Sequence, residues 1–162
     1  MKCVVDTNVP VVANGRERRR PHSLECRLAA VEFLNELVSR GRVVVDFGGE
    51  VRREYRRRLN PAGQPGVGDR FYLEVLNSNP KFVESIELHR SNDGGFIDCP
   101  QSLIDAGFDV SDRKFVALAM LSSGTVINAV DSDWIDHADL LRSENVAVRN
   151  ICGCEKMCWF VP

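Results

Sequence analysis

The sequence predicts one domain of the α/β class over residues 1–162, a three-layer α/β/α sandwich around a mainly parallel sheet of about five strands. One observation favours this class, and two more favour a single globular domain. Short apolar runs alternate along the chain with stretches of helical periodicity. The 162 residues suffice for one hydrophobic core. The hydrophobic fraction of 44% and the charged fraction of 27% are those of ordinary globular proteins, and they indicate no functional class.

The first element is a short apolar run at residues 3–5, which predicts a strand buried on both faces. It ends abruptly on Asp6-Thr7-Asn8. Residues 9–13 have room for one or two helical turns, and residues 14–22 form a polar, basic loop. Ser23 stands where an N-cap belongs, and a helix is expected from there to Gly41. Its apolar positions at helical spacing are Leu24, Leu28, Val31, Leu34, Leu37 and Val38.

The middle of the chain begins with a second apolar run closed by an acid, residues 42–46. Residues 47–49 make a turn into a helix over 50–59, which stops at Asn60-Pro61 and carries Val51, Tyr55 and Leu59 on one stripe. The composition of residues 61–68 predicts a loop. A short helix is expected over 71–76 and an extended stretch over 82–88, and residues 90–100 are irregular.

The last third returns to regular alternation. A helix is expected over 111–121, with Ser111 as its cap, Asp112 in its first turn and Phe115, Leu118 and Ala119 facing inward. Gly124 ends it. Residues 125–130 form a strand closed by Asp131, and a short helix over 134–141 leads to a final strand over 146–151.

Two features bear on the compartment. No stretch approaches the roughly 20 apolar residues that span a bilayer, and no basic segment followed by an apolar run begins the chain, so a cytoplasmic protein is expected. The six cysteines are then expected to be reduced, mostly as small buried side chains. Cys152, Cys154 and Cys158 lack the fourth ligand of a structural zinc site, which favours free thiols.

The charges divide unevenly along the chain. Residues 1–60 hold 13 Lys and Arg against 8 Asp and Glu, whereas residues 61–162 hold 8 against 15. One interpretation is a protein that binds a polyanion on one side and cations on the other. The alternative is charge pairing within the molecule, and the counts alone leave both open.

Three predicted strands end on acids, Asp6, Asp46 and Asp131. Two acids on helices, Glu54 and Asp112, fall where a helix can lean over the same sheet edge. Converging carboxylates cannot all be ionised at neutral pH without a counter-charge. Oxygen ligands with no His or Cys pair beside them favour Mg²⁺ or Mn²⁺ over Zn²⁺. Asp46 is instead expected to cap the turn into the helix that follows it.

These residues carry a resemblance that covers nearly the whole chain. Val4-Val5-Asp6-Thr7-Asn8, Glu54-Tyr55, the run Asp112-Arg-Lys-Phe-Val-Ala-Leu-Ala119 and Val130-Asp131-Ser132-Asp133 have the order and approximate spacing of the PIN-domain nucleases, to which the chain is similar. The resemblance implies a Mg²⁺- or Mn²⁺-dependent endoribonuclease acting on single-stranded RNA. In many members of the family the nuclease is the toxin of a toxin–antitoxin pair, so the resemblance implies an antitoxin protein as a partner. Small nucleases of the family are commonly dimers, so it also implies a homodimer.

The resemblance also implies roles for individual residues. Asp6, Glu54, Asp112 and Asp131 take the catalytic, metal-binding positions, although Glu50 lies one turn before Glu54 and competes with it. Asp133 becomes an auxiliary acid near the metal, and Asn8 a residue that holds Asp6 or a bound water. Arg52, Arg53, Arg56 and Arg57 are candidates for contacts with substrate phosphates, as is the basic run at residues 16–20.

Two departures from the family pattern and two alternative functions remain. Ala129 stands where the family often has Ser or Thr, and residues 61–100 match none of its motifs. One alternative is a catalytically silent module that binds RNA or a partner protein. The other is a receiver-like Mg²⁺-binding signalling domain, but such a domain needs a Lys at the end of a late strand, and residues 146–151 contain none.

Overall fold

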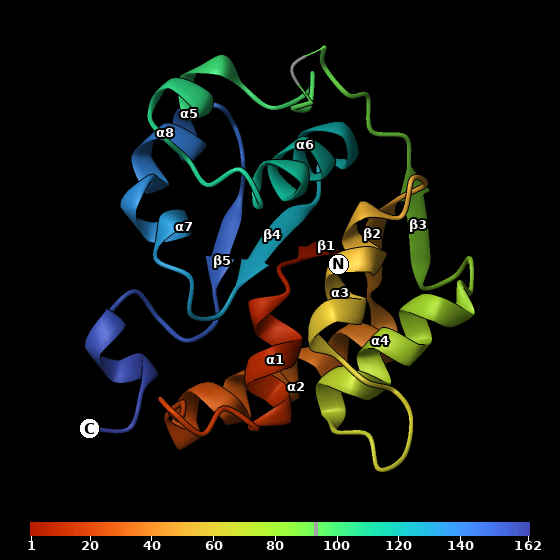
Figure 1. The fold of residues 1–162 in the computed structure, drawn as a ribbon, viewed down its shortest axis with the longest axis vertical. Helices are drawn as coiled ribbons and strands as arrows, with labels where there is room; N and C mark the ends of the chain where they lie inside the picture. The colour runs from red at the N-terminus through yellow and green to blue at the C-terminus, as the bar shows by residue number, and fades with distance from the viewer. Residues whose placement is uncertain (93) are drawn as a thin grey trace.

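A computed structural model describes residues 1–92 and 94–162 (Figure 1). In these residues the chain forms five strands and eight α-helices, which confirms the predicted α/β class. The strands are β1 (Lys2–Val5), β2 (Arg42–Asp46), β3 (Val83–Ile86), β4 (Thr125–Asn128) and β5 (Val148–Asn150). All neighbouring strands pair in parallel, in the order β3-β2-β1-β4-β5.

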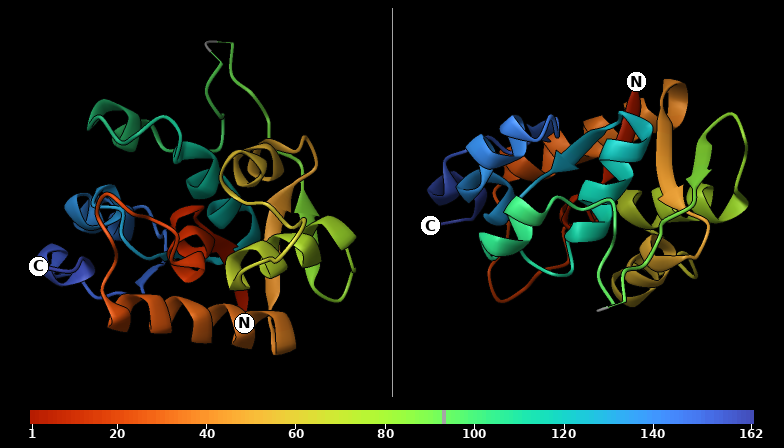
Figure 2. Two further views of the ribbon diagram at one scale, coloured as in Figure 1. Left: turned by 60° about the horizontal axis from the view of Figure 1, so that its bottom comes forward. Right: turned by 90° about the horizontal axis from the view of Figure 1, so that it is seen from above.

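The helices are α1 (Asn8–Asn14), α2 (Leu24–Arg40), α3 (Glu50–Arg58), α4 (Val67–Asn77), α5 (Gln101–Asp105), α6 (Arg113–Ser122), α7 (Asp133–Asp136) and α8 (Ala138–Ser143). Helices α1, α2 and α4 pack on one another, and α6 lies across β1, β2, β3 and β4. Figure 2 shows α2 and α6 on opposite sides of the strands. This arrangement gives the three layers that the sequence predicts.

The strand order reverses beside β1. The chain moves outward from β1 to β2 and β3, then crosses back to β4 on the other side of β1 and continues outward to β5. The loops that follow β1 and β4 therefore diverge to opposite faces of the sheet and leave a crevice at the carboxyl ends of these two strands. In open α/β sheets this is where ligands bind.

The core is built from the apolar strands and the inner faces of the helices. Val4, Val44 and Val126 are completely buried, as parallel strands covered on both faces require. Helix α1 approaches α4 so closely that a Cβ on Gly68 would lie 1.9 Å from the carbonyl oxygen of Pro10. Glycine at position 68 therefore allows α1, the helix that begins just after Asp6, to pack this closely against α4.

The buried face of α2 differs from the prediction. Leu34 and Leu37 are buried, but Leu24 and Leu28 are 62% and 50% exposed, and Val38 also faces outward. The residues that α2 buries are Cys26, Ala30, Phe33, Leu34 and Leu37. Both sets have helical spacing, so periodicity alone could not choose between them; the position of α2 against α1 and α4 decides.

Helix α4 begins at Val67, within the stretch predicted as a loop. Asp69 explains the early start, because its carboxylate accepts hydrogen bonds from the N–H groups of Gly66 at 3.0 Å and Asn60 at 2.9 Å. The predicted helix over 134–141 is divided into α7 and α8 at His137. The extended stretch after residue 82 is confirmed as β3.

The N-cap of helix α6 lies one residue later than predicted, because Ser111 does not cap the helix. The Ser111 hydroxyl donates instead to Asp109 Oδ1 at 2.6 Å, and Asp112 occupies the N-cap position. The predicted role of Asp46 is confirmed. Its two carboxylate oxygens accept from the N–H groups of Glu50 at 2.7 Å and Val51 at 2.9 Å, and so anchor the start of α3.

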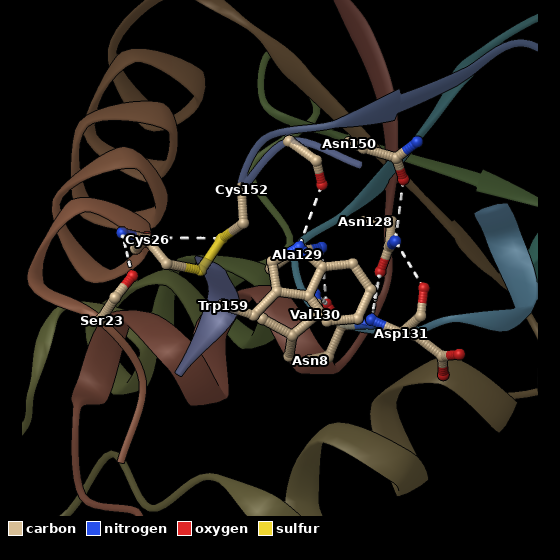
Figure 3. Close-up of a disulfide and its surroundings, with 11 residues drawn as sticks. Asn8, Ser23, Cys26, Asn128, Ala129, Val130, Asp131, Asn150, Cys152 and Trp159 are labelled. Atoms are coloured by element: carbon tan, nitrogen blue, oxygen red, sulfur yellow. Dashed lines mark hydrogen bonds between the residues drawn. A yellow bond between two sulfur atoms is a disulfide. The ribbon is translucent and has the colours of Figure 1, made fainter. Parts of the chain in front are cut away.

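The prediction that the cysteines are reduced is wrong for one pair. Cys26 in the first turn of α2 and Cys152 just after β5 form a disulfide, with their Cα atoms 4.8 Å apart (Figure 3). The 126 residues between them hide this contact from the sequence. Cys154 and Cys158 are free, as predicted, but they are exposed and not buried. Within residues 1–92 and 94–162, no helix has the length and apolar character needed to cross a membrane.

Candidate metal centre

Three of the predicted acids meet in the crevice between β1 and β4. Asp6 follows β1, Asp131 lies in the loop after β4, and Asp112 precedes α6, which packs across the sheet. One carboxylate oxygen of each lies within 4.8 Å of the others. An ion of the size of Mg²⁺ sits about 2.1 Å from each ligand oxygen and so holds ligands about 3 to 4 Å apart. The three side chains therefore have nearly the spacing of a coordination set.

Asp6 is fixed by donors on both of its oxygens. The backbone N–H of Asn8 donates to Oδ1 at 2.9 Å, and the indole Nε1–H of Trp134 donates to Oδ2 at 2.7 Å. Asp6 is only 4% exposed. Trp134 belongs to the core and is completely buried. Its hydrogen bond to Asp6 gives it a second role that the sequence did not predict.

A set of asparagine side chains joins the ends of β1, β4 and β5 (Figure 3). The Asn8 amide donates to Asn128 Oδ1 at 2.9 Å, and the Asn128 amide donates to the Asp131 carbonyl and to Asn150 Oδ1, both at 2.8 Å. Asn128 Oδ1 also accepts from the N–H of Asp131 at 3.0 Å. The loop that carries Asp131 is therefore held by hydrogen bonds to Asn128 at the end of β4, which in turn bonds to Asn150 at the end of β5.

The predicted support by Asn8 takes a different form from the one expected. Its backbone N–H binds Asp6, while its side-chain Oδ1 accepts from the N–H of Ala129 at 2.8 Å. The segment around Ala129 is thus held by a hydrogen bond from its backbone to Asn8. This bond does not require a Ser or Thr side chain at position 129. Asn128 was missed because nothing in its sequence neighbourhood marks it as more than a polar residue within the strand predicted over 125–130.

Burial is the main cause that raises the pKa values of all three acids, and neighbouring carboxylates add to it. Burial raises the pKa of Asp6 to about 7, with Asp131 and Glu54 adding to the effect, although hydrogen bonds from Asn8 and Trp134 oppose it. Burial first, and then the charges of Asp6 and Asp131, raise the pKa of Asp112 to about 8. Burial also raises the pKa of Asp131. A cation between these groups would stabilise their ionised forms.

The donor set fits a hard divalent cation. The three ligand atoms are carboxylate oxygens from separate elements, and in the described part of the chain the group contains neither His nor Cys. Mg²⁺ and Mn²⁺ prefer such ligands. Asp6, Asp112 and Asp131 are thus the residues that would hold the ion.

Glu54 lies at the edge of this group and not within it. Its Oε1 accepts from the Thr7 hydroxyl at 2.5 Å, and its other oxygen forms an ion pair with the buried Lys114. Glu50 is clearly separate, because its carboxylate binds Arg53 and Arg90. The choice between the two glutamates therefore falls on Glu54, with Lys114 as a neighbour that the sequence did not predict.

Asp133 supports the centre through its backbone. Its N–H donates to Asp131 Oδ1 at 2.9 Å, whereas its carboxylate accepts from the N–H of Asp109 at 2.9 Å. Asp133 is not one of the three acids whose carboxylate oxygens cluster. The auxiliary role of its carboxylate near the metal stays a prediction.

The predicted arginines separate into two groups. Arg57 lines the cavity of about 340 Å³ that contains the acids, together with Arg58, one turn after Glu54. Arg58 belongs to the same basic run, residues 52–58. Arg52 donates to the Asp46 carbonyl and to Ser78, and Arg53 to the Gly48 carbonyl. Arg56 lines a different hollow.

The fold and the site together define an α/β protein with a cluster of three aspartates, spaced so that they could hold a cation, where the strand order reverses. Comparisons of the chain with protein-family models, with curated proteins and with solved structures find no match.

Proposed function

We propose that this protein is a Mg²⁺- or Mn²⁺-dependent endoribonuclease that cleaves single-stranded RNA, similar to the PIN-domain nucleases. The observation that carries the proposal is the convergence of Asp6, Asp112 and Asp131 in the crevice between β1 and β4. Two buried carboxylates and a half-buried one, brought together from three parts of the chain, are costly unless they share a cation. Their residue types, order and spacing are those of the resemblance.

When bound, Mg²⁺ or Mn²⁺ would lower the pKa of a water molecule and offset charge on the phosphodiester. Asp6, Asp112 and Asp131 would bind the ion through their oxygens. Trp134 and the N–H of Asn8 orient Asp6 and favour its ionised form. Glu54, held by Thr7 and Lys114, would act at the edge of the site through water. Cleavage should leave 3′-hydroxyl and 5′-phosphate ends.

The partners follow from the same resemblance. Single-stranded RNA would reach the centre past Arg57 and Arg58, whose guanidinium groups are exposed and line its cavity. If the protein is a toxin, an antitoxin protein is a further partner. We also propose that it forms a homodimer and that it is located in the cytoplasm.

The test is a cleavage assay on a mixture of single-stranded RNAs with Mn²⁺, with EDTA and with Asp6→Asn. The expected result is cleavage in Mn²⁺, none in EDTA, and a loss of more than about a hundredfold in the variant. Asp139→Asn is the matched control, because the Asp139 side chain is 98% exposed and pairs with Arg142 outside the site. Undiminished cleavage by Asp6→Asn would exclude the proposed mechanism.

Other outcomes identify the alternatives. RNA binding that EDTA leaves unchanged, without cleavage in any metal, indicates a catalytically silent module. Covalent phosphorylation of an aspartate by a small acyl phosphate would indicate a receiver-like domain. The geometry speaks against the latter, because Lys114 lies on α6 and β5 ends on Asn150.

A further inference from the structure

A second cavity, of about 240 Å³, adjoins the acidic centre. It lies between α3, the start of α6 and the segment after β3, and it shares Glu54, Arg57 and Ser111 with the cavity of the acids. Among the described residues, its lining has five cationic side chains against two carboxylates, Glu50 and Glu54. A positively charged space thus lies directly beside a negatively charged one.

Two arginines in this cavity are held side by side by one carboxylate. Glu50 Oε1 accepts from a terminal nitrogen of Arg53 and from one of Arg90, each at 2.5 Å. One negative charge between two guanidinium groups leaves a net positive charge. Glu50 therefore positions the arginines without neutralising them both.

Each arginine has a further anchor. Arg90 donates to the Gly94 carbonyl at 2.7 Å, and its guanidinium lies 5.0 Å from the centre of the Phe96 ring. Arg53 donates to the Gly48 carbonyl at 3.0 Å. A guanidinium has five N–H donors, so donors remain on both after these bonds are formed. Because the side chains are already in place, an anion that binds them loses less free energy to ordering.

Arg57 connects this cavity with the acidic centre. It lines both cavities and is exposed. Within residues 1–92 and 94–162, its guanidinium forms neither a hydrogen bond nor an ion pair with another side chain. It is therefore available to a ligand that extends from one cavity into the other.

We propose that Arg53, Arg57 and Arg90 form an arginine pocket that binds the phosphate next to the scissile phosphate on a single RNA strand. The inference rests on the proposed function for its substrate class. A polymer with one charge on every unit suits the two cavities, since one phosphate can lie at the acidic centre while its neighbour occupies the arginine pocket. The planar guanidinium groups match phosphate oxygens.

The test measures binding of a labelled single-stranded RNA in EDTA, where metal-dependent cleavage does not occur. Arg90→Ala and Arg57→Ala should each weaken binding about tenfold. Each should also reduce the slope of log affinity against log salt by about 0.7, the value for one phosphate contact on a single strand. Arg90→Lys should keep the slope but lose affinity, because it retains the charge without the planar fork.

Arg40→Ala is the control, because Arg40 is 75% exposed on α2 and pairs with Glu36, as Arg53 pairs with Glu50. It should leave both affinity and salt slope unchanged. Thermal unfolding of each variant shows whether a loss of binding reflects a loss of folding.

The outcomes separate the two proposals. Wild-type affinity and salt slope in both Arg90→Ala and Arg57→Ala overturn the arginine pocket, even where Mn²⁺-dependent cleavage is found. If cleavage is absent but both variants lose RNA affinity, the pocket remains an RNA site and only the nuclease proposal fails. If a polyglutamate peptide of equal charge binds as tightly and loses affinity in the same variants, the assignment to RNA is overturned.

Discussion

Asp6 illustrates how the surroundings of one residue determine its chemistry. Its carboxylate is buried beside two other acids, which favours the neutral form, while donors on both oxygens favour the charged form. The balance leaves its pKa at about 7. Asp6 can therefore lose its proton near neutral pH when a cation arrives.

Trp134→Phe should weaken the binding of Mn²⁺. The substitution keeps an aromatic ring in the buried position but removes the indole N–H that donates to Asp6. The pKa of Asp6 should then rise, and the free energy of unfolding should fall by about 1 to 3 kcal/mol because a buried acceptor loses its partner. Isothermal titration with Mn²⁺ and unfolding by urea measure the two effects.

Trp159→Phe provides the comparison. Trp159 is also buried, and its indole N–H donates to the Gly153 carbonyl, outside the acidic centre. This variant should be less stable but bind Mn²⁺ as the wild type does. Equal losses of Mn²⁺ affinity in both variants would contradict a specific role for Trp134.

The stability of the metal-free protein should fall as pH rises from about 4 to about 8. In this range the folded protein retains protons on Asp6 and Asp112, whose pKa values are about 7 and about 8, while the unfolded chain has released them. The folded state binds more protons, so the free energy of unfolding decreases with pH. Thermal midpoints of the wild type and of Asp6→Asn, measured over the same pH range, separate the contribution of Asp6 from that of the other acids.

Added Mn²⁺ should have the opposite dependence on pH. The ion binds ionised carboxylates and displaces protons, so its stabilising effect should grow between about pH 6 and about pH 8. Differences in the thermal midpoint with and without Mn²⁺ measure it. A stabilisation that does not change over this range would mean that Mn²⁺ does not bind at Asp6 and Asp112.

At the residue scale, the sequence predicted acids better than their partners. Asp6, Asp112 and Asp131 could be selected because strand ends and helix starts have recognisable patterns, and parallel strands bring their ends to one edge. Trp134 and Lys114 could not, since which buried side chain donates to an acid depends on packing. A Trp in this sequence is equally typical of a core residue, and a Lys is equally typical of the solvated face of a helix.

At the scale of elements, three parallel strands are joined at their ends by asparagine side chains. Parallel strands exchange backbone hydrogen bonds along their length, but the loops beyond them have no such ladder. Asn128 and Asn150 are the last paired residues of β4 and β5, and Asn8 lies just beyond β1; hydrogen bonds between their side chains connect the ends of the three strands. The position of Asp131 thus depends on strands as well as on its own loop.

Asn128→Ala should lower the free energy of unfolding by about 2 to 4 kcal/mol and weaken Mn²⁺ binding. Asn128 is completely buried, and its side chain bonds to Asn8, Asn150 and both backbone groups of Asp131. The alanine would leave several of these groups without partners. Asn35→Ala, an exposed position on α2, is the control for unfolding in urea and for Mn²⁺ titration.

The elements themselves were predictable to different degrees. The existence of β1, β2, α3 and α6 followed from apolar runs and helical stripes that are several residues long. The start of α4 did not, because it depends on Asp69 bonding to backbone groups of Gly66 and Asn60. The face of α2 also required knowledge of its neighbours, since two stripes of similar character compete along it.

At the scale of the whole molecule, the Cys26–Cys152 disulfide joins α2 to the segment after β5. This segment is also held by backbone contacts, from the N–H of Ser23 to the Trp159 carbonyl and from that of Val161 to the Pro21 carbonyl, each at 2.9 Å. The two distant parts of the chain are therefore joined both covalently and by hydrogen bonds.

Reduction of this disulfide should lower the free energy of unfolding by about 2 to 5 kcal/mol, because the bond restricts the unfolded chain across a separation of 126 residues. Thermal unfolding with and without a dithiol measures the change. Cys26→Ser should already be less stable and should not respond to the dithiol. In a reducing cytoplasm the contribution would be absent, so the other contacts of the segment would have to hold it in place.

The same bond changes what a break in the backbone would do. The chain from residue 26 to residue 152 is a closed covalent ring, and residues 62–64 are exposed within it, between α3 and α4. A single proteolytic cut there would open the ring without releasing a fragment. The nicked protein would migrate as one species until a thiol divides it in two, so its fragments would stay assembled around the sheet after the chain itself is no longer continuous.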